Sequence, residues 1–372
     1  MTKDKLLFAN LTTKQTYLEW GRIFFSVLNT FTEAGYTIEL LDNEALHKLD
    51  VYGKPVFDLK NLTVVKQAPT DTENYSYLYD KKDSQLNNAV WKKQVFLKFD
   101  LYASYCFEEP MIMPFPVHPL QEIYGYIPRL PALREAKRNL RILFAGDIDQ
   151  YRRTWVTHPQ EKLPRQEIIE TIKEQLAAEK LHIIANEVSF TEAMQAEFIN
   201  KFVIIDNDSQ RIDNKLWLDT LAKSQFFFSP PGIVMPMCHN ITEAMAIGCI
   251  PITNYPEWLH PNLEHGVNCI VFDTKRDLLE QIDAVLAMDD ATILQMKNNA
   301  IAYYEQHLKK AAFMEKLEAK QQEKVTVLYY TEGNTAFNTK KLNKHSVLMR
   351  DTTVPIKQSG IRYQVMKYLG RV

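Results

Sequence analysis

A glutamate stands one turn inside a predicted helix that follows a strand and a proline-containing turn. Phe226–Phe228 reads as a short strand, a Pro-Pro-Gly turn ends at Gly232, and a helix opens at Asn240. The free N–H groups and positive dipole end of such a helix favour an anion, and the carboxylate of Glu243 accepts hydrogen bonds from hydroxyls. A nucleotide contains both a phosphate and a ribose diol, so a phosphate site at the helix start beside a diol site at Glu243 predicts nucleotide binding.

The residues around this turn could complete a nucleotide site. His239 and Asn240 could donate hydrogen bonds to a phosphate or a sugar, and the loop from Gly232 to Thr242 would surround both. Simpler roles compete: Asn240 suits an N-cap, Gly232 suits any turn, and a first-turn glutamate complements the helix dipole. We therefore expect Gly232, His239, Asn240, Thr242 and Glu243 to bind substrate, with Glu243 as the leading candidate.

Two arginines follow a predicted strand of the same half of the chain. Arg152 and Arg153 come after Phe144-Ala145-Gly146, and ligands of open α/β sheets bind at the carboxyl ends of the strands. Arginine stabilises a departing diphosphate through paired hydrogen bonds, without a metal. Gly146, Arg152 and Arg153 are therefore expected to border the ligand. Two solvated surface arginines are the competing interpretation.

Two D-x-D triplets, Asp147-Ile148-Asp149 and Asp206-Asn207-Asp208, offer carboxylate oxygens of the kind that Mg²⁺ and Mn²⁺ prefer. Such triplets occur often by chance in loops. We expect no required metal, and the metal-dependent interpretation stays a rival.

Transfer to a hydroxyl needs a group that polarises it. His118 lies between Pro116 and Pro119, and imidazole can be neutral at pH 7, so it is the candidate base. A structural role for a histidine at a domain junction is the alternative. Four acidic residues are further, unranked candidates: Glu19, Asp100, Glu108 and Glu109.

The segment around Glu243 resembles the donor-binding half of GT-B glycosyltransferases, most closely the exostosin-like group. The matching residues are Leu221, Ser224-Gln225-Phe226, Ser229-Pro230-Pro231-Gly232, Glu243-Ala244 and Gly248-Cys249-Ile250-Pro251-Ile252. The resemblance implies two Rossmann-like domains that face a central cleft, a nucleoside-diphosphate sugar as co-substrate, and a Glu243 that binds the ribose. Asn240 stands where exostosin-like proteins usually carry arginine, and Met235 where related retaining enzymes carry the first of two glutamates. Inversion and retention both stay open.

Composition narrows the class of protein. The 372 residues are enough for two domains, and a net charge of −2 argues against a general nucleic-acid binder. The cysteines show no CxxC spacing, as expected for reduced thiols in a cytoplasmic protein. The first residues lead into a strand-like Leu6–Ala9 rather than a signal peptide, and no apolar run reaches the roughly 18 residues of a membrane span.

The first part of the chain predicts a βαβ unit and hence a parallel sheet. Strands are expected at Leu6–Asn10 and Tyr36–Leu41. A helical stripe lies between them: Tyr17, Trp20, Phe24, Leu28 and Phe31. Further strands are expected at Leu62–Lys66, Gln94–Leu101 and around Met111–Pro119. Asp71–Asn88, polar and rich in tyrosine, is expected to be a surface loop that faces an acceptor.

A second alternation of strands and helices begins at Leu140. Strands are expected at Arg141–Ala145, Leu181–Ala185, Phe202–Ile205 and Asn268–Phe272. Helices are expected at Arg165–Glu179, Lys275–Met288 and Ala291–Gln322. This alternation predicts an α/β protein of two doubly wound domains, with acceptor binding in 1–135 and nucleotide-sugar binding in 136–330. The remaining 331–372 is basic, and either crosses back to the first domain or rests on an anionic membrane that holds a lipid-linked acceptor.

The sequence therefore predicts a metal-independent glycosyltransferase that moves a sugar to a hydroxyl of a carbohydrate, in surface polysaccharide or glycan synthesis. Two rivals are a metal-dependent D-x-D transferase of the other fold and a non-catalytic nucleotide- or sugar-binding protein. The chain has no G-x-G-x-x-G after Leu6–Asn10 or Arg141–Ala145, which disfavours a Rossmann oxidoreductase. It also lacks a G-x-x-x-x-G-K-[ST] motif, which disfavours a P-loop kinase or NTPase.

Overall fold

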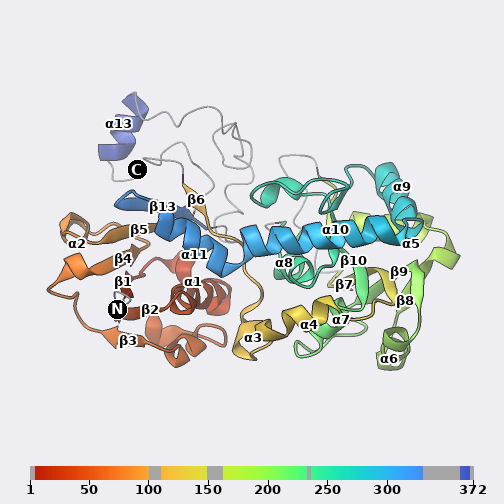
Figure 1. Cartoon of the computed structure of the whole chain (residues 1–372), viewed down its shortest axis with the longest axis horizontal. Coiled ribbons are helices and arrows are strands. Elements are labelled where there is room, and N and C mark those ends of the chain that lie inside the picture. Colours follow the sequence, from red (N-terminus) through yellow and green to blue (C-terminus); the bar gives the residue numbers. More distant parts are fainter. Residues whose placement is uncertain (1–4, 100–109, 149–161, 233–235, 330–360, 369–372) are drawn as a thin grey trace. The chain divides into compact units, whose positions relative to one another are not determined.

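The computed structural model describes residues 5–99, 110–148, 162–232, 236–329 and 361–368. The chain divides into two compact units (Figure 1). The first unit consists of Met1–Pro114 and Lys309–Val372, and the second unit of Phe115–Leu308. Each unit contains its own sheet, and every strand pairing in the described residues is parallel. The predicted class, α/β with two doubly wound parallel sheets, is confirmed.

The sheet of the first unit has the order β3-β2-β1-β4-β5-β13-β6. Its strands are β1 (Lys5–Asn10), β2 (Tyr36–Leu41), β3 (Leu62–Val65), β4 (Tyr75–Tyr79), β5 (Lys93–Lys98), β6 (Met111–Ile112) and β13 (Lys324–Leu328). The order reverses between β1 and β4, because β1 leads to β2 on one side and β4 leads to β5 on the other. Ligands of such sheets bind outside the carboxyl ends of the strands at a reversal of this kind.

The described helices of the first unit are α1 (Arg22–Glu33), α2 (Ser84–Asn88), α11 (Lys310–Ala319) and α13 (Ile361–Tyr368). Apolar side chains of α1 and α11 share one core with side chains of β1, β2, β5 and β13. The predicted helical stripe holds from Phe24 to Phe31, both of which are buried. Trp20 departs from it, because α1 begins only at Arg22 and Trp20 is 65% exposed in a 3-10 turn, Glu19–Gly21.

The prediction that Asp71–Asn88 forms a surface loop is wrong. This segment contains β4, which pairs with β1 on one side and β5 on the other and is buried over most of its length. Tyr77 and Tyr79 of β4 form an aromatic cluster with Phe8 and Trp91, in which the Tyr77 and Trp91 rings lie 4.5 Å apart. Tyrosine fits a half-buried pleated surface as well as aliphatic side chains do, so a polar-looking tyrosine-rich segment can form a central strand.

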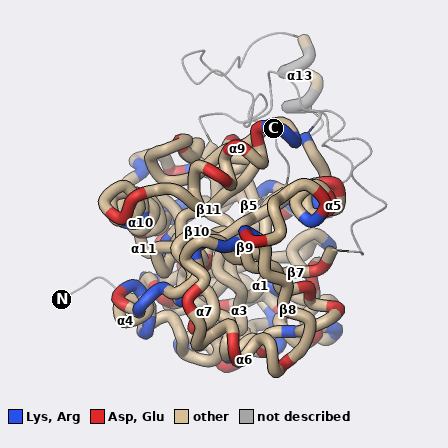
Figure 2. Tube along the Cα trace, turned by 90° about the vertical axis from the view of Figure 1, so that its right-hand side faces the viewer, with Lys and Arg blue, Asp and Glu red and all other residues tan. Residues whose placement is uncertain are grey.

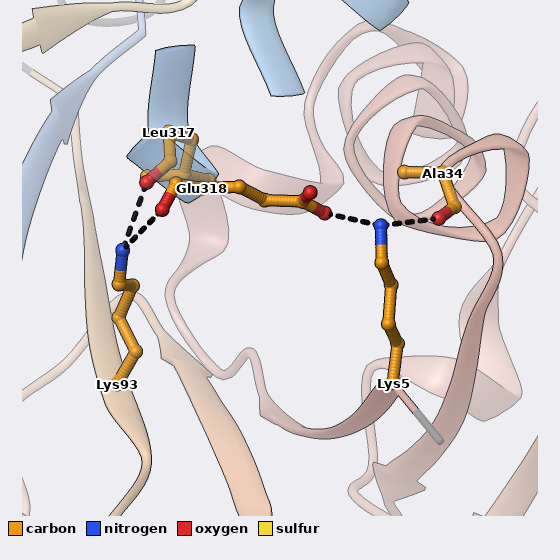
Figure 3. A network of polar contacts seen from close by, with 5 residues as sticks. All are labelled: Lys5, Ala34, Lys93, Leu317 and Glu318. Atoms are coloured by element: carbon orange, nitrogen blue, oxygen red, sulfur yellow. Dashed lines mark hydrogen bonds and ion pairs between the residues drawn. The ribbon is translucent and has the colours of Figure 1, made fainter. Parts of the chain in front are cut away.

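Residues near the C-terminus complete the sheet of the first unit. β13 lies between β5 and β6, and two lysines hold the preceding helix α11. Lys93 donates to the carbonyls of Leu317, Glu318 and Lys320 at the end of α11, at 2.9, 3.4 and 2.7 Å. Lys5 bridges the Glu318 carboxylate at 2.7 Å and the carbonyl of Ala34 at 3.1 Å, just after α1 (Figure 3). Both ammonium groups therefore lie where helix carbonyls carry partial negative charge.

The sheet of the second unit has the order β12-β11-β10-β7-β9-β8. Its strands are β7 (Leu140–Gly146), β8 (Leu181–Ile184), β9 (Phe198–Asp206), β10 (Ser224–Phe228), β11 (Ile250–Thr253) and β12 (Ile270–Val271). Its described helices are α3 (Pro119–Ile123), α4 (Leu130–Arg134), α5 (Arg165–Gln175), α6 (Glu187–Gln195), α7 (Trp217–Leu221), α8 (His239–Ala246), α9 (Lys275–Leu286) and α10 (Asp290–Tyr303), followed by a π-helical turn, Tyr304–Leu308.

Alternate residues of β7, β9, β10 and β11 pack against α5, α9 and α10 in one core, as the period of two along a strand requires. Ile142 and Phe144 of β7 and Phe226 and Phe228 of β10 are among them. Outside this core, α5 and α9 carry acidic and basic residues together, and neither sign dominates them (Figure 2). Among the described residues, no helix has the length and apolar character that crossing a membrane requires.

The division into units differs from the predicted domains at both boundaries. Residues 115–135 belong to the second unit, where Arg134 donates to the carbonyl of Ala246 at 2.8 Å and Arg129 pairs with Asp219 at 2.6 Å. Residues 309–330 belong to the first unit. The predicted helix Ala291–Gln322 is interrupted, since Lys309 is extended and α11 starts afresh after it. Of the predicted basic segment, 331–372, residues 331–360 and 369–372 lie outside the described residues.

Candidate functional site

The strand order of the second unit reverses between β7 and β10. β7 leads through α5 to β8 on one side of the sheet, and β10 leads through α8 to β11 on the other. The carboxyl end of β7 is Gly146, and that of β10 runs into Ser229-Pro230-Pro231-Gly232. The connections that leave these two ends diverge, so this edge is where an open α/β sheet binds its ligands.

A buried arginine joins the two strand ends at this reversal. Arg165, the first residue of α5, donates from Nη1 to the carbonyl of Asp147 at 3.1 Å. On the β10 side, Nε donates to the carbonyl of Pro231 at 3.0 Å and Nη2 to that of Pro230 at 3.3 Å. These three carbonyl groups solvate the buried guanidinium in place of water. The strand reversal of the second unit therefore contains a buried, fixed positive charge.

Helix α8 begins beside the same turn. Its N-cap is Cys238, and the helix starts at His239, so Asn240 does not have the alternative role of N-cap. Asn240 instead lies in the first turn and is half-buried. Ser229 and Tyr255, which follow β10 and β11, are hydrogen-bonded through their hydroxyls at 2.7 Å. The first N–H groups of α8, a hydroxyl pair and Arg165 thus surround the end of β10.

Three of the predicted site residues share one face of α8, because 239, 242 and 243 follow the three- and four-residue spacing of a helix. All three bind the segment that opens the second unit. The Nδ1 atom of His239 is 2.8 Å from the Pro116 carbonyl oxygen, and the hydroxyl of Thr242 donates to the Phe115 carbonyl at 2.9 Å. The carboxylate of Glu243 accepts from the backbone N–H of His118 at 2.8 Å. This face of α8 therefore fixes residues 115–118.

Glu243 is buried, and both of its oxygens accept hydrogen bonds from the protein. Trp217 donates from its indole Nε1 to the second oxygen at 2.5 Å. Burial raises the pKa of Glu243 to about 7, while the bonds from His118 and Trp217 act in the opposite direction. The carboxyl group therefore serves as an anchor for α7, α8 and residues 115–118. Its predicted contact with a ribose would have to share oxygens that already hold these donors.

His118 has a clear structural role. It is the N-cap of α3, and its Nδ1 accepts from the backbone N–H of Leu120 at 3.2 Å. Its ring stands edge-on to that of His239, with 5.1 Å between the centroids. If His118 is to move a proton as the predicted base, it must do so through Nε2, because Nδ1 is occupied as an acceptor.

Two further predicted residues, Gly146 and Gly232, lie at the carboxyl end of β7 and in the turn after β10. Gly232 donates its N–H to the carbonyl of Pro236 at 3.1 Å, and the carbonyl of Gly146 accepts from the N–H of Asn207 at 3.2 Å. A Cβ at Gly146 would meet its nearest neighbours at ordinary contact distance, so close approach does not require this glycine. Arg152, Arg153, Met235, Asp100, Glu108 and Glu109 lie outside the described residues.

Neither D-x-D triplet gathers a metal site within the described part of the chain, where no three His, Cys, Asp or Glu side chains come together. Asp206 instead accepts from the backbone N–H of Asp208 at 3.3 Å, and Asp149 is not described.

Arg165, Trp217 and Tyr255 are members of this arrangement that sequence reasoning missed. Arg165 is the first residue of a predicted helix, where a charged residue looks like part of a solvated face, and Trp217 looks like an ordinary apolar residue. A position after Pro164, at the start of the helix that follows β7, is the one signal that points to Arg165.

No protein-family model matches the chain, and no curated protein matches it in sequence. Solved structures with a similar arrangement include a glycosyltransferase involved in avilamycin A biosynthesis, AviGT4, at 12% identity and a TM-score of 0.43 over 84% of this chain and 96% of that one. HepE from Anabaena in complex with UDP is similar at 12% identity and a TM-score of 0.44, over 84% and 98% of the two chains. A glycosyltransferase from Rickettsia africae has 7% identity and a TM-score of 0.44, over 86% and 97%. These likenesses are too distant to assign a substrate or site residues.

Proposed function

We propose that this protein is a glycosyltransferase that moves a sugar from a nucleoside-diphosphate sugar to a hydroxyl of a carbohydrate. The diphosphate would bind at the carboxyl ends of β7 and β10. The observation that carries the proposal is Arg165, which holds a buried positive charge at the reversal of strand order. A sheet edge of this type binds ligands, and a fixed positive charge there selects an anion.

The reaction needs positive potential at this place. When the sugar leaves, negative charge grows on the diphosphate, and groups fixed in advance stabilise it without reorganisation. Arg165 supplies such a charge, and the first N–H groups of α8 add a positive dipole end. Asn240, in the first turn of α8, is the side chain proposed to bind a phosphate or the sugar. Arg152 and Arg153 stay proposed diphosphate ligands.

The acceptor hydroxyl needs a base or the departing phosphate to take its proton. His118 stays the proposed base, with Nε2 as its reactive atom, because Nδ1 already accepts from Leu120. No metal is proposed, since Arg165 and the helix end offer positive charge in its place. Glu243 is proposed to act by fixing α8 and residues 115–118, with the ribose as a further partner of its carboxylate.

The proposed setting is surface polysaccharide or glycan synthesis at the cytoplasmic side of a membrane. Residues 337–372 carry eight lysines and arginines against one acid, Asp351, which suits contact with anionic lipid and a lipid-linked acceptor.

A second candidate is a nucleotide- or sugar-binding protein without turnover. The observation that favours it is Glu243, whose two oxygens already accept bonds from His118 and Trp217. The second candidate binds a nucleotide or a sugar, and only the first cleaves a donor.

The test is incubation with UDP-, GDP-, ADP-, dTDP- and CMP-linked sugars in the presence of EDTA, with and without oligosaccharide acceptors. The proposal predicts release of one nucleotide, faster with an acceptor. Binding of a nucleotide without release from any donor would favour the second candidate. If no nucleotide binds, the transferase and the nucleotide-binding protein both fail, and a sugar-binding protein stays open.

A further inference from the structure

The first unit contains a pocket of its own. Its volume is about 510 Å³, within the roughly 300–1,000 Å³ typical of small-ligand sites. One wall is the segment that follows β1, with Lys14, Tyr17 and Trp20, and the other is the segment that follows β2, with Asn43 and Lys48. The pocket therefore opens at the carboxyl ends of two parallel strands, where open α/β sheets bind ligands.

Buried polar contacts fix the first wall. Asp80, which follows β4, accepts hydrogen bonds from the backbone N–H groups of Thr12 and Thr13 at 2.8 and 3.0 Å. It also accepts from the hydroxyls of Thr13 and Thr16. A carboxylate with four donors holds the loop after β1 in one arrangement. The wall is thus formed before a ligand arrives.

The two walls are joined by backbone and by a side-chain amide. Asn43 donates to the carbonyl of Leu11 at 3.1 Å, and the N–H of Tyr52 donates to the carbonyl of Trp20 at 3.2 Å. Gly21 lies so close to Gly53 that a Cβ on Gly21 would stand 2.6 Å from the Gly53 Cα atom. This contact requires glycine and sets the position of the residue before it, Trp20.

Trp20 has a backbone that its residue type disfavours. Its φ and ψ are 60° and 26°, and it stands between Glu19 at φ 57° and Gly21 at φ 83°. Two non-glycine residues in the left-handed region are strained, and such strain is found at binding sites more than elsewhere. The tryptophan gains little from burial in return, because it is 65% exposed. Its exposed ring is a feature that folding alone does not explain.

The chemistry of the pocket fits a neutral sugar. An exposed indole offers a flat apolar face on which the C–H face of a sugar ring can pack, and the polar side chains around it can bind hydroxyls. The two cations of the lining, Lys14 and Lys48, are matched by two acids, Glu44 and Asp50, so the pocket has no excess charge to select a phosphate. We propose that this pocket binds a neutral oligosaccharide, with Trp20 as its stacking platform. Within the proposed function, on which this inference rests, that ligand is the acceptor.

The test is saturation-transfer NMR with neutral di- and trisaccharides of glucose, galactose and N-acetylglucosamine, on the full chain and on Trp20→Gly and Trp20→Phe. Glycine suits the left-handed backbone, so Trp20→Gly should melt no lower than wild type while its affinity for the bound saccharide falls about tenfold or more. Trp20→Phe, which keeps an aromatic face, should retain most of the affinity. Val90→Ala, which alters another exposed apolar residue of the same unit, should bind like wild type.

Equal saccharide binding by wild type and Trp20→Gly would overturn the inference, and so would the absence of binding by any member of the panel. Loss of nucleotide affinity instead of saccharide affinity in Trp20→Gly would also overturn it, since the pocket would then hold a nucleotide. Nucleotide affinity is measured on the same samples. Saccharide binding that depends on Trp20 in a chain that binds no nucleotide would support the pocket and remove the proposed transferase function.

Discussion

The carboxylate of Glu243 accepts a hydrogen bond from the backbone N–H of His118 at 2.8 Å, across 125 residues of sequence. The same carboxylate accepts from the indole of Trp217 at 2.5 Å. One buried side chain of α8 therefore satisfies a backbone donor at the start of the second unit and a side-chain donor on α7.

Replacement of Glu243 by alanine should destabilise the protein. Two buried donors would lose their acceptor, and each unsatisfied group costs about 1–3 kcal/mol, so we expect a loss of about 3 kcal/mol in the free energy of unfolding. Urea denaturation followed by circular dichroism measures it. Glu192→Ala, an exposed glutamate of α6, is the control and should change stability little. Equal stability of Glu243→Ala and wild type would contradict the anchoring role.

Glu243 should also give stability a particular pH dependence. Burial raises its pKa to about 7 in the folded protein, above the ordinary glutamate pKa of 4.5. Between these pH values the folded state keeps a proton that the unfolded state releases. The contribution is therefore complete below pH 4.5 and is lost as the pH rises toward 7, by ~3 kcal/mol in all.

To measure this dependence, the free energy of unfolding is determined against pH for wild type and for Glu243→Gln, which lacks the titrating group. The difference between the two proteins isolates the contribution of Glu243. Burial lowers the pKa of His260 to about 4, which gives an opposite slope in both proteins and cancels in the difference. A constant difference in the free energy of unfolding from pH 4.5 to 7 would show that Glu243 does not titrate there.

Lys93 should stabilise the packing of helix α11 in the first unit. Lys93→Met keeps the aliphatic stem but removes the bonds to the carbonyls of Leu317, Glu318 and Lys320, so we expect a loss of about 1–2 kcal/mol. Urea denaturation measures it, and Lys92→Met, the exposed neighbour, is the matched control. Limited proteolysis should cut α11 faster in the Lys93 variant only. Identical cleavage in both variants would contradict the role of Lys93.

Asn240→Asp should separate helix stability from anion binding. A negative charge in the first turn of α8 complements the helix dipole and should stabilise the unliganded protein by about 0.3–1 kcal/mol. The same charge should repel a diphosphate and weaken its binding about tenfold or more. Asn186→Asp adds the same charge at the N-cap of α6 and should leave affinity unchanged. Calorimetric titration with the nucleoside diphosphate that binds wild type checks both variants. If Asn240→Asp and Asn186→Asp weakened nucleotide binding equally, the effect would come from net charge at long range and not from a site at α8.

Local patterns in the sequence were enough to predict most of the parallel strands. β2 appears with its predicted bounds, Tyr36–Leu41, because a short apolar run between a glycine and a polar turn has few alternatives. β4 was missed because its tyrosines resemble the polar residues on either side, and only their packing with Phe8 and Trp91 makes them a core. The return of α11 and β13 to the first unit depends on long-range pairing with β5 and β6, which no local pattern carries.

For the candidate site, the sequence indicated which residues lie together on α8, but not which groups they contact. Glu243, His239 and Thr242 do gather on one face of α8, as their spacing indicates, but they bind the backbone of residues 115–118. A sequence shows that a carboxylate is present, and only the fold shows which donors reach it first. Arg165 was missed for the converse reason, since its charge lies inside the protein because the Asp147, Pro230 and Pro231 carbonyls converge on it.

Hydrogen–deuterium exchange with and without a nucleoside diphosphate shows whether the nucleotide binds at the strand reversal of the second unit. UDP, GDP, ADP and dTDP are screened first by thermal shift in EDTA, and the one that stabilises the protein is used at saturation. We expect slower exchange at Ser229 and Gly232, in the first turn of α8 and at the start of α5, where the proposed site of the second unit lies. Protection confined to other segments, such as 11–21 and 42–50 around the pocket of the first unit, would contradict it.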